Sequence, residues 1–212
     1  MTLAAHRFDA LIRPDHVHGS LYTDPAIYQL ELDRIWRRGW VYVGHVSEVP
    51  QPNDYVMKSI GPQPILMTRD REGRIHLLHN RCPHRGNRVC MTDKGQARSF
   101  TCPYHGWTFG NDGSLKGYPF PSGYEGVDRK DLGLGRVARV GIYKGFVFGC
   151  LSADGITLDE HLGAARDAID ALCLNSPEGE VEITAGFLKH RVRANWKFLV
   201  ENETDGYHPS FV

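Results

Sequence analysis

The spacing of apolar residues predicts one helix over residues 25–36. Asp24 is a suitable N-cap, and Pro25 favours the first position of a helix. Gly39 then ends the helical pattern. The inner stripe of this helix would consist of Ile27, Leu30 and either Ile35 or Trp36.

The stretch 40–151 instead shows short β-type runs separated by turns. Residues 70–73 and 111–113 read as hairpin turns, because Gly73 and Gly113 tolerate the positive φ of a tight turn. Strands this short and this closely spaced predict a small antiparallel sandwich or barrel. The expected strands are 41–46, 55–60, 64–68, 74–79, 107–109, 137–140 and 146–151.

A second helical pattern follows the predicted strands. Thr157 and Glu160 have the form of a capping box at its start. Residues 180–193 then resemble one long strand, and residues 196–207 form a possible final helix. The chain is therefore of the α+β class. The apolar stripe of the second helix would be Leu158, Leu162, Ala165, Ile169 and Leu172.

Composition narrows the class of protein. The 212 residues are 41% apolar and 24% charged, an ordinary globular mixture. The net charge of zero argues against a nucleic-acid or anionic-membrane partner, and no apolar run is long enough to cross a bilayer. Residues 1–13 do not resemble a secretory signal, so we expect a cytoplasmic protein. Five cysteines in that compartment indicate metal or redox use.

Four residues form a candidate metal site. Cys82 and His84 lie in one Gly-containing loop, and Cys102 and His105 lie in a second. Such a set fits zinc in a closed tetrahedral site, or a two-iron, two-sulfur cluster with two histidine ligands. Zinc fingers usually pair Cys with Cys and His with His, whereas each loop here is mixed, with a first gap of one residue. The spacing favours the iron–sulfur cluster.

These loops, Cys-Pro-His-Arg-Gly and Cys-Pro-Tyr-His-Gly-Trp, resemble those of Rieske iron–sulfur proteins. The resemblance covers residues 40–155 and implies an antiparallel β Rieske domain holding a [2Fe–2S] cluster. Respiratory members carry an extra disulfide-forming Cys in each loop, where this chain has Asn87 and Tyr104. The loops are therefore similar to the ring-hydroxylating oxygenase type, and Trp107 is expected to pack beside the cluster. The other thiols, Cys90, Cys150 and Cys173, are expected to be reduced and partly buried.

A second pattern lies near the C-terminus: Asn-Trp-Lys at 195–197, Glu-Asn at 201–202, and Asp-Gly-Tyr-His at 205–208. It resembles the start of the mononuclear-iron site in the large (alpha) subunit of aromatic-ring-hydroxylating dioxygenases. The resemblance implies that His208 is the first Fe(II) ligand and that Asp205 is a catalytic bridging acid. The second His of the family would fall at position 213, one residue beyond Val212, and the acidic ligand later. The resemblance thus implies an N-terminal fragment, inactive alone, with an incomplete iron site.

The resemblance divides the chain into a helical arm packing on the catalytic domain (1–39), the Rieske domain (40–155) and the beginning of a truncated catalytic domain (156–212). It implies an oxidoreductase of aromatic hydrocarbon catabolism, assembled as a homotrimer or as alpha3beta3 with a small subunit. Electrons from NADH would come through a partner reductase, directly or through a ferredoxin. Dioxygen activated at the iron would hydroxylate an aromatic ring. A likeness to the benzoate group implies an aryl carboxylate substrate, and demethylation is the alternative reaction.

Two alternatives to the oxygenase stay open. One is a Rieske-type electron-transfer protein without oxygenase activity, and the other is a zinc-stabilised binding module. Arg81, Arg85 and Arg88 concentrate positive charge around the first loop. They could steer an acidic ferredoxin, or they could simply form a solvated loop.

Overall fold

The computed structural model describes residues 8–184 and 192–206. The chain divides into two compact units, one formed by Met1–Ile35 with Phe187–Val212 and the other by Trp36–Gly186. Within the described ranges, every helix is too short or too polar to span a membrane.

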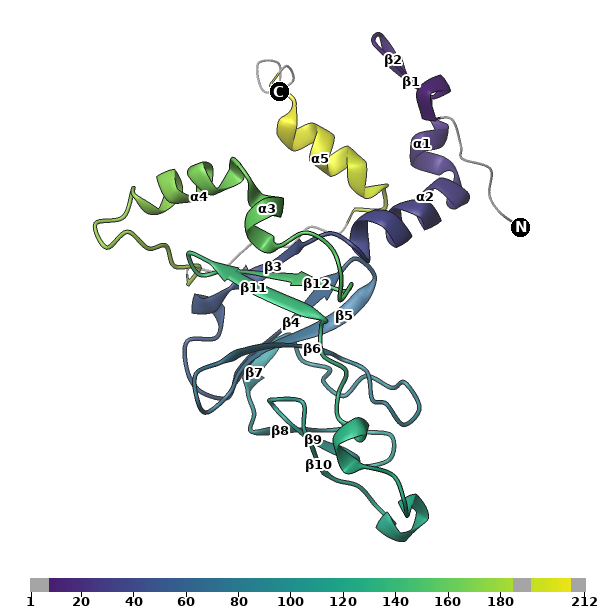
Figure 1. The fold of residues 1–212 in the computed structure, drawn as a ribbon, viewed down its shortest axis with the longest axis vertical. Helices are drawn as coiled ribbons and strands as arrows, with labels where there is room; N and C mark the ends of the chain where they lie inside the picture. Colours follow the sequence, from purple (N-terminus) through teal and green to yellow (C-terminus); the bar gives the residue numbers. More distant parts are fainter. Residues whose placement is uncertain (1–7, 185–191, 207–212) are drawn as a thin grey trace. The chain divides into compact units, whose positions relative to one another are not determined.

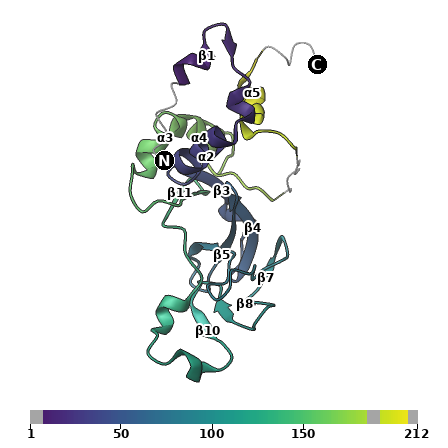
Figure 2. The same cartoon turned by 90° about the vertical axis from the view of Figure 1, so that its right-hand side faces the viewer.

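The larger unit contains antiparallel sheets, as the short strands predict (Figure 1). Figures 1 and 2 both show one sheet between two others. The outer sheet has the order β11 (Arg139–Tyr143), β12 (Phe146–Cys150), β3 (Val41–His45). The middle sheet has the order β6 (Ile75–His79), β5 (Gln63–Arg69), β4 (Asp54–Ile60), β7 (Lys94–Gln96). The end sheet has the order β10 (Leu115–Gly117), β9 (Thr108–Gly110), β8 (Ser99–Thr101). Strands β7, β8 and β10 were not anticipated, because three residues are too few to show an alternating pattern.

The middle sheet is buried on both faces. On β5, Leu66 belongs to one apolar core, whereas Ile65 and Met67 on either side of it belong to another. Leu78 and Leu77 on β6 divide in the same way, because successive side chains of a strand point to opposite faces. The core that contains Ile65, Met67 and Leu77 lies against β11-β12-β3. The core that contains Leu66 and Leu78 lies against β10-β9-β8 and the two cysteine-containing loops. The middle sheet therefore gives these loops a rigid base.

A buried carboxylate closes the turn between β5 and β6. Asp70 is 2% exposed and accepts hydrogen bonds from the Arg74 backbone N–H (2.8 Å), from Arg74 Nε (2.7 Å) and from His76 Nε2 (2.7 Å). Burial alone would raise the pKa of Asp70, but the hydrogen bonds from His76 and Arg74 lower it from 3.8 to about 2. Gly73, at φ 84°, completes the predicted turn.

Replacing Asp70 with Asn should reduce the free energy of unfolding by about 2 kcal/mol at neutral pH, because buried donors lose a charged acceptor. Since folding lowers the pKa of Asp70, its contribution is complete above 3.8 and is lost as the pH falls through about 2. Urea unfolding at pH 7 and at pH 2 measures both effects. If the free energies of unfolding of the wild-type protein and of Asp70→Asn differ by the same amount at pH 7 and at pH 2, Asp70 does not have the lowered pKa.

The predicted second helix is two helices, α3 (Leu158–Leu162) and α4 (Ala165–Cys173), because Gly163 adopts φ 45° between them. The capping box of Thr157 and Glu160 is confirmed. The predicted apolar stripe is only partly right, since Leu162 is buried but Leu172 is 48% exposed. The predicted strand 180–193 is wrong where it can be seen: residues 180–184 and 192–193 have no strand, and 185–191 lie outside the described residues.

The smaller unit is largely helical. Its described elements are the hairpin β1 (Ile12–Arg13) and β2 (His16–Val17) and the helices α1 (Ser20–Thr23), α2 (Pro25–Glu31) and α5 (Trp196–Thr204). Asp24 caps α2 by accepting from the Ala26 N–H at 2.8 Å, as predicted. The predicted helix 25–36 ends in a π-helical turn, η2 (Leu32–Trp36). The smaller unit also contains the 3₁₀ segment η1 (Phe8–Ala10). The larger unit contains three such segments among its described residues: η3 (Val46–Glu48), η4 (Pro121–Tyr124) and η5 (Arg129–Leu132).

Candidate metal centre

Two loops of matching geometry carry the predicted cluster ligands. In the first, the Cys82 N–H donates to Asn87 O (2.8 Å) and the Gly86 N–H donates to Cys82 O (2.9 Å). In the second, the Cys102 N–H donates to Trp107 O (2.7 Å) and the Gly106 N–H donates to Cys102 O (3.0 Å). Gly86 and Gly106 adopt φ 75° and 72°, a backbone conformation that favours glycine. The same turn thus presents a Cys and a His twice.

The loops bring all four predicted ligands together. Cys82 and Cys102 are each 2% exposed, and their thiols contact each other. The rings of His84 and His105 lie side by side, with centroids 4.7 Å apart. The site therefore has a buried sulfur pair and an adjacent imidazole pair.

The chemistry of these groups fits a two-iron cluster. Burial raises the pKa of the Cys82 thiol, and Cys102 adds to that effect, so the thiolates require a nearby cation. His84 Nδ1 is buried without a hydrogen-bond partner among the described residues, as expected of a nitrogen that binds metal. Burial, with the nearby His84 and Arg85, lowers the pKa of His105 and so favours the neutral form of an imidazole that can bind a metal.

The grouping of the ligands argues against a single zinc ion. A closed zinc site needs four ligands around one ion, whereas each iron of a Rieske cluster takes only two from the protein. Paired thiols beside paired imidazoles therefore match the cluster better.

Trp107 covers the imidazole side of the site. It is 3% exposed, and its ring stacks on His84 with a centroid distance of 5.2 Å and an interplanar angle of 2°. Tyr118 stacks on Trp107 in turn, at 5.1 Å. These rings keep water from that side of the centre, which strengthens electrostatic interactions there.

Asn80 is a functional candidate that the sequence analysis missed. Its fully buried side chain accepts from the backbone N–H groups of Val89 (3.0 Å) and Cys90 (2.9 Å) and donates to Cys90 O (2.7 Å). One amide thus ties the end of β6, just before the first loop, to the backbone just after it. A single Asn ending the apolar strand pattern was the available signal.

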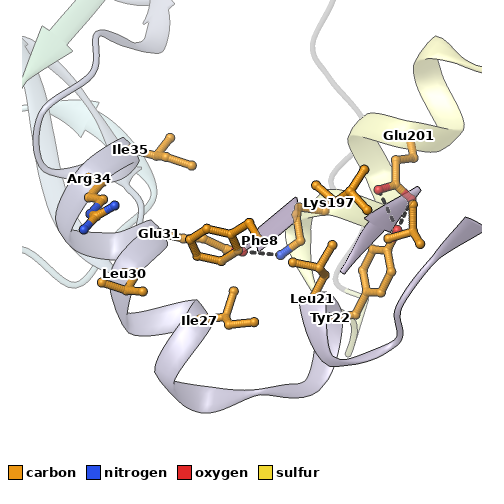
Figure 3. A pocket seen from close by; sticks show the side chains of 12 residues that line it. Phe8, Leu21, Tyr22, Ile27, Leu30, Glu31, Arg34, Ile35, Lys197 and Glu201 are labelled. Carbon is orange, nitrogen blue, oxygen red and sulfur yellow. Dashed lines mark hydrogen bonds and ion pairs between the residues drawn. The ribbon is translucent and has the colours of Figure 1, made fainter. Parts of the chain in front are cut away.

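The C-terminal motif docks α5 within the smaller unit. The buried Glu31 of α2 accepts from Trp196 Nε1 at 2.8 Å. Glu31 also pairs with Lys197 Nζ (Figure 3). The Tyr22 hydroxyl donates to Glu201 at 2.8 Å. The Asn-Trp-Lys motif and Glu201 therefore fix the helix that precedes the proposed iron site.

Asp205 is the exposed C-cap residue of α5. Tyr207 and His208 lie outside the described residues, so the predicted contact between Asp205 and His208 remains a prediction. The smaller unit also contains an apolar hollow of about 380 Å³, walled by Phe8, Leu21, Ile27 and Leu30 (Figure 3).

Comparisons with known proteins agree with this geometry. Residues 39–130 match the model of the Rieske [2Fe-2S] domain. Toluate 1,2-dioxygenase subunit alpha of Pseudomonas putida is 38% identical over all of this chain and 49% of its own length. The N,N-dimethyl phenylurea N-demethylase subunit alpha of a Sphingobium species is 38% identical over 94% of this chain and 43% of its own. Naphthalene 1,2-dioxygenase from Rhodococcus, solved with indole bound, has a TM-score of 0.85 at 32% identity, covering 92% of this chain and 45% of its own.

The fold, the two matched loops and the family model identify a protein with a Rieske [2Fe–2S] domain. The chain is homologous to the alpha subunits of aromatic-ring-hydroxylating dioxygenases. It spans about half the length of the curated relatives it matches.

Proposed function

We propose that this chain belongs to a terminal oxygenase that receives electrons from an NADH-dependent reductase, directly or through a ferredoxin. A bound Rieske cluster would supply one-electron transfer. Cys82 and Cys102 would hold one iron, and His84 and His105 the other. Trp107 would shield the imidazoles from water. The observation that carries this proposal is the pairing of two buried thiols with two adjacent imidazoles.

We further propose that Asp205 and His208 begin the mononuclear Fe(II) site, with His208 as a ligand. A carboxylate hydrogen-bonded to a ligating imidazole fixes its tautomer and raises its basicity. Asp205 would hold His208 in this way and would also face a Rieske histidine of a neighbouring subunit, in a homotrimer or an alpha3beta3 assembly. Support comes from α5, since Glu31 and Lys197 anchor the helix that ends at Asp205.

The division of the chain is also a proposal. Residues 40–155 would form the Rieske domain, and 156–212 would begin the catalytic domain. The arm, residues 1–39, would pack on the catalytic domain, which the apolar hollow of the smaller unit supports. The fold and the homologous alpha subunits suit a cytoplasmic location.

We propose aryl carboxylates as substrates and ring dihydroxylation as the reaction. Support comes from the toluate dioxygenase relative, whose substrate is an aryl carboxylate. Oxidative N-demethylation is a second candidate, because an N-demethylase subunit is equally similar to this chain, at 38% identity.

The test uses the subunit expressed from its complete reading frame, with the reductase, NADH, benzoate and ¹⁸O₂. We expect a ring product labelled in both oxygens. In a His208→Ala variant, Fe(II) and product should be lost while the Rieske EPR signal persists. The matched control is His161→Ala, at an exposed position of α3, which should retain both.

Three outcomes would contradict the proposal. One is a reading frame without a second histidine and a later carboxylate. Another is a His208→Ala variant that keeps its iron and activity. The third is a protein that carries the cluster but binds no mononuclear iron, which would favour the electron-transfer protein.

A further inference from the structure

We propose that the electron donor is an acidic [2Fe–2S] protein that docks on the surface around Arg129 and Lys130, and that Tyr118 and Trp107 link this surface to His84. The inference rests on the proposed function, since it assumes that the Rieske cluster is reduced by a partner protein. This surface differs from the arginines of the first cluster loop, which could steer an acidic ferredoxin or could simply form a solvated loop.

A continuous stack of side chains runs from the candidate cluster ligand to the surface. Trp107 stacks on His84 at an interplanar angle of 2°, and Tyr118 stacks on Trp107 at 30°. The guanidinium carbon of Arg129 lies 5.4 Å from the centroid of the Tyr118 ring, within the range of a cation–π interaction. Tyr124 braces the stack, with its ring 5.0 Å from Tyr118 and 5.4 Å from Trp107. Exposure rises along this line, from the buried Trp107 to the exposed Arg129.

The stack ends at a basic hollow. A concave surface of about 560 Å³ is lined by Arg129, Lys130 and Arg136, with Asp131 as its acidic residue. Arg136 is held in place by donating to Asp112 O at 2.6 Å, and Arg129 donates to Lys116 O at 3.4 Å. Local positive charge on a chain whose net charge is zero favours an acidic partner and accelerates its encounter.

The arginines of the first loop are less suited to receive the donor. Arg81 packs against the turn, because a Cβ atom at Gly86 would lie 3.1 Å from Arg81 Nε. Arg85 directly follows the proposed ligand His84 in the chain, inside the tight turn of the first loop. In the proposed function, the imidazole end also faces the neighbouring subunit. A donor at Arg129 and Lys130 would leave that end free.

The redox step is a transfer of one electron without a proton or a bond change. The reduced [2Fe–2S] donor loses one electron, and the oxidised Rieske cluster gains it. The transfer is downhill, since Rieske centres have higher reduction potentials than plant-type ferredoxins. Trp107 and Tyr118 serve as the intervening medium and are neither oxidised nor reduced.

The first experiment measures binding of an acidic plant-type ferredoxin to this chain by calorimetry, with both clusters oxidised. We expect the double variant Arg129→Gln, Lys130→Gln to bind about tenfold more weakly at low salt, since two exposed charge contacts are lost. The difference should shrink at high salt. The matched control is Arg71→Gln, Arg98→Gln, which removes the same charge from exposed positions lining a separate hollow. Equal weakening in both variants would overturn the assignment.

The second experiment measures the rate of cluster reduction at saturating reduced ferredoxin by stopped flow. Tyr118→Leu should slow the limiting rate several-fold without changing the affinity for ferredoxin. Tyr118→Phe keeps the ring and should therefore keep the limiting rate of the wild-type protein. A Leu variant as fast as the Phe variant would contradict the role of the stack.

The failure of this inference can be distinguished from failure of the proposed function. If the chain forms no cluster that dithionite can reduce, the proposed function fails. If dithionite reduces the cluster but the Arg129→Gln, Lys130→Gln variant binds ferredoxin as tightly as the wild-type protein, only the docking surface is wrong.

Discussion

Replacing Cys102 with Ala should leave the purified chain without an iron–sulfur cluster. Cys102 is 2% exposed and meets Cys82 at the base of the two loops, where it would supply one of two thiolates to one iron. Loss of that ligand leaves the iron with an open position in an apolar surrounding. Iron and acid-labile sulfide in Cys102→Ala should therefore fall to background, and the visible absorption of the cluster should disappear.

The matched control is Cys90→Ala. Cys90 is also buried, at 6% exposure, and packs in the same apolar core as Cys82 and Cys102. The substitution thus removes an equal number of atoms from the same core without touching the four candidate ligands. The control should retain its iron and sulfide. Cluster loss in both variants would mean that the core, rather than the ligand, was the cause.

The second large effect is expected at Asn80. Asn80→Ala removes the amide that bonds to three backbone groups of Val89 and Cys90, and it leaves those groups buried without partners. We expect the free energy of unfolding to fall by about 3 kcal/mol. Because this amide fixes the return of the first loop, the reconstituted cluster should also be lost faster to a chelator. Urea unfolding and the decay of visible absorption measure the two effects.

Asn87→Ala is the control for Asn80. Asn87 has the same side chain and lies in the first loop, but among the described residues its amide donates to one group, the exposed Arg88 O, at 2.9 Å. The cost of this substitution should stay below about 1 kcal/mol. A similar loss of stability and of cluster in the two variants would show that the buried network is not what holds the loop.

Local sequence signals predicted much of the fold. The Asp24 cap, the capping box of Thr157 and Glu160, and the Gly73 and Gly113 turns depend on neighbouring residues only. The four candidate cluster ligands were predicted from their residue types and spacing, and the structure brings the two thiols together and the two imidazoles together. The antiparallel class followed from short strands with hairpin turns between them.

Long-range contacts could not be predicted in the same way. Asn80 bonds across the first loop to Val89 and Cys90, and Glu31 bonds to residues of a helix 165 positions later in the chain. The periodicity of apolar residues does not indicate such polar pairs. The prediction that Leu172 is buried was wrong. Gly163 turns the chain between α3 and α4, so the apolar residues of the two helices do not form one continuous face. The stack of Trp107 on Tyr118 depends on the folded positions of the second loop and of the segment that follows β10.

The most direct test of the account is the metal content and EPR spectrum of this chain. We predict about two iron and about two acid-labile sulfide per chain, and, after reduction with dithionite, the EPR signal of a cluster with mixed cysteine and histidine ligands. Zinc without sulfide would contradict the account, and so would the signal of a cluster held by four cysteines.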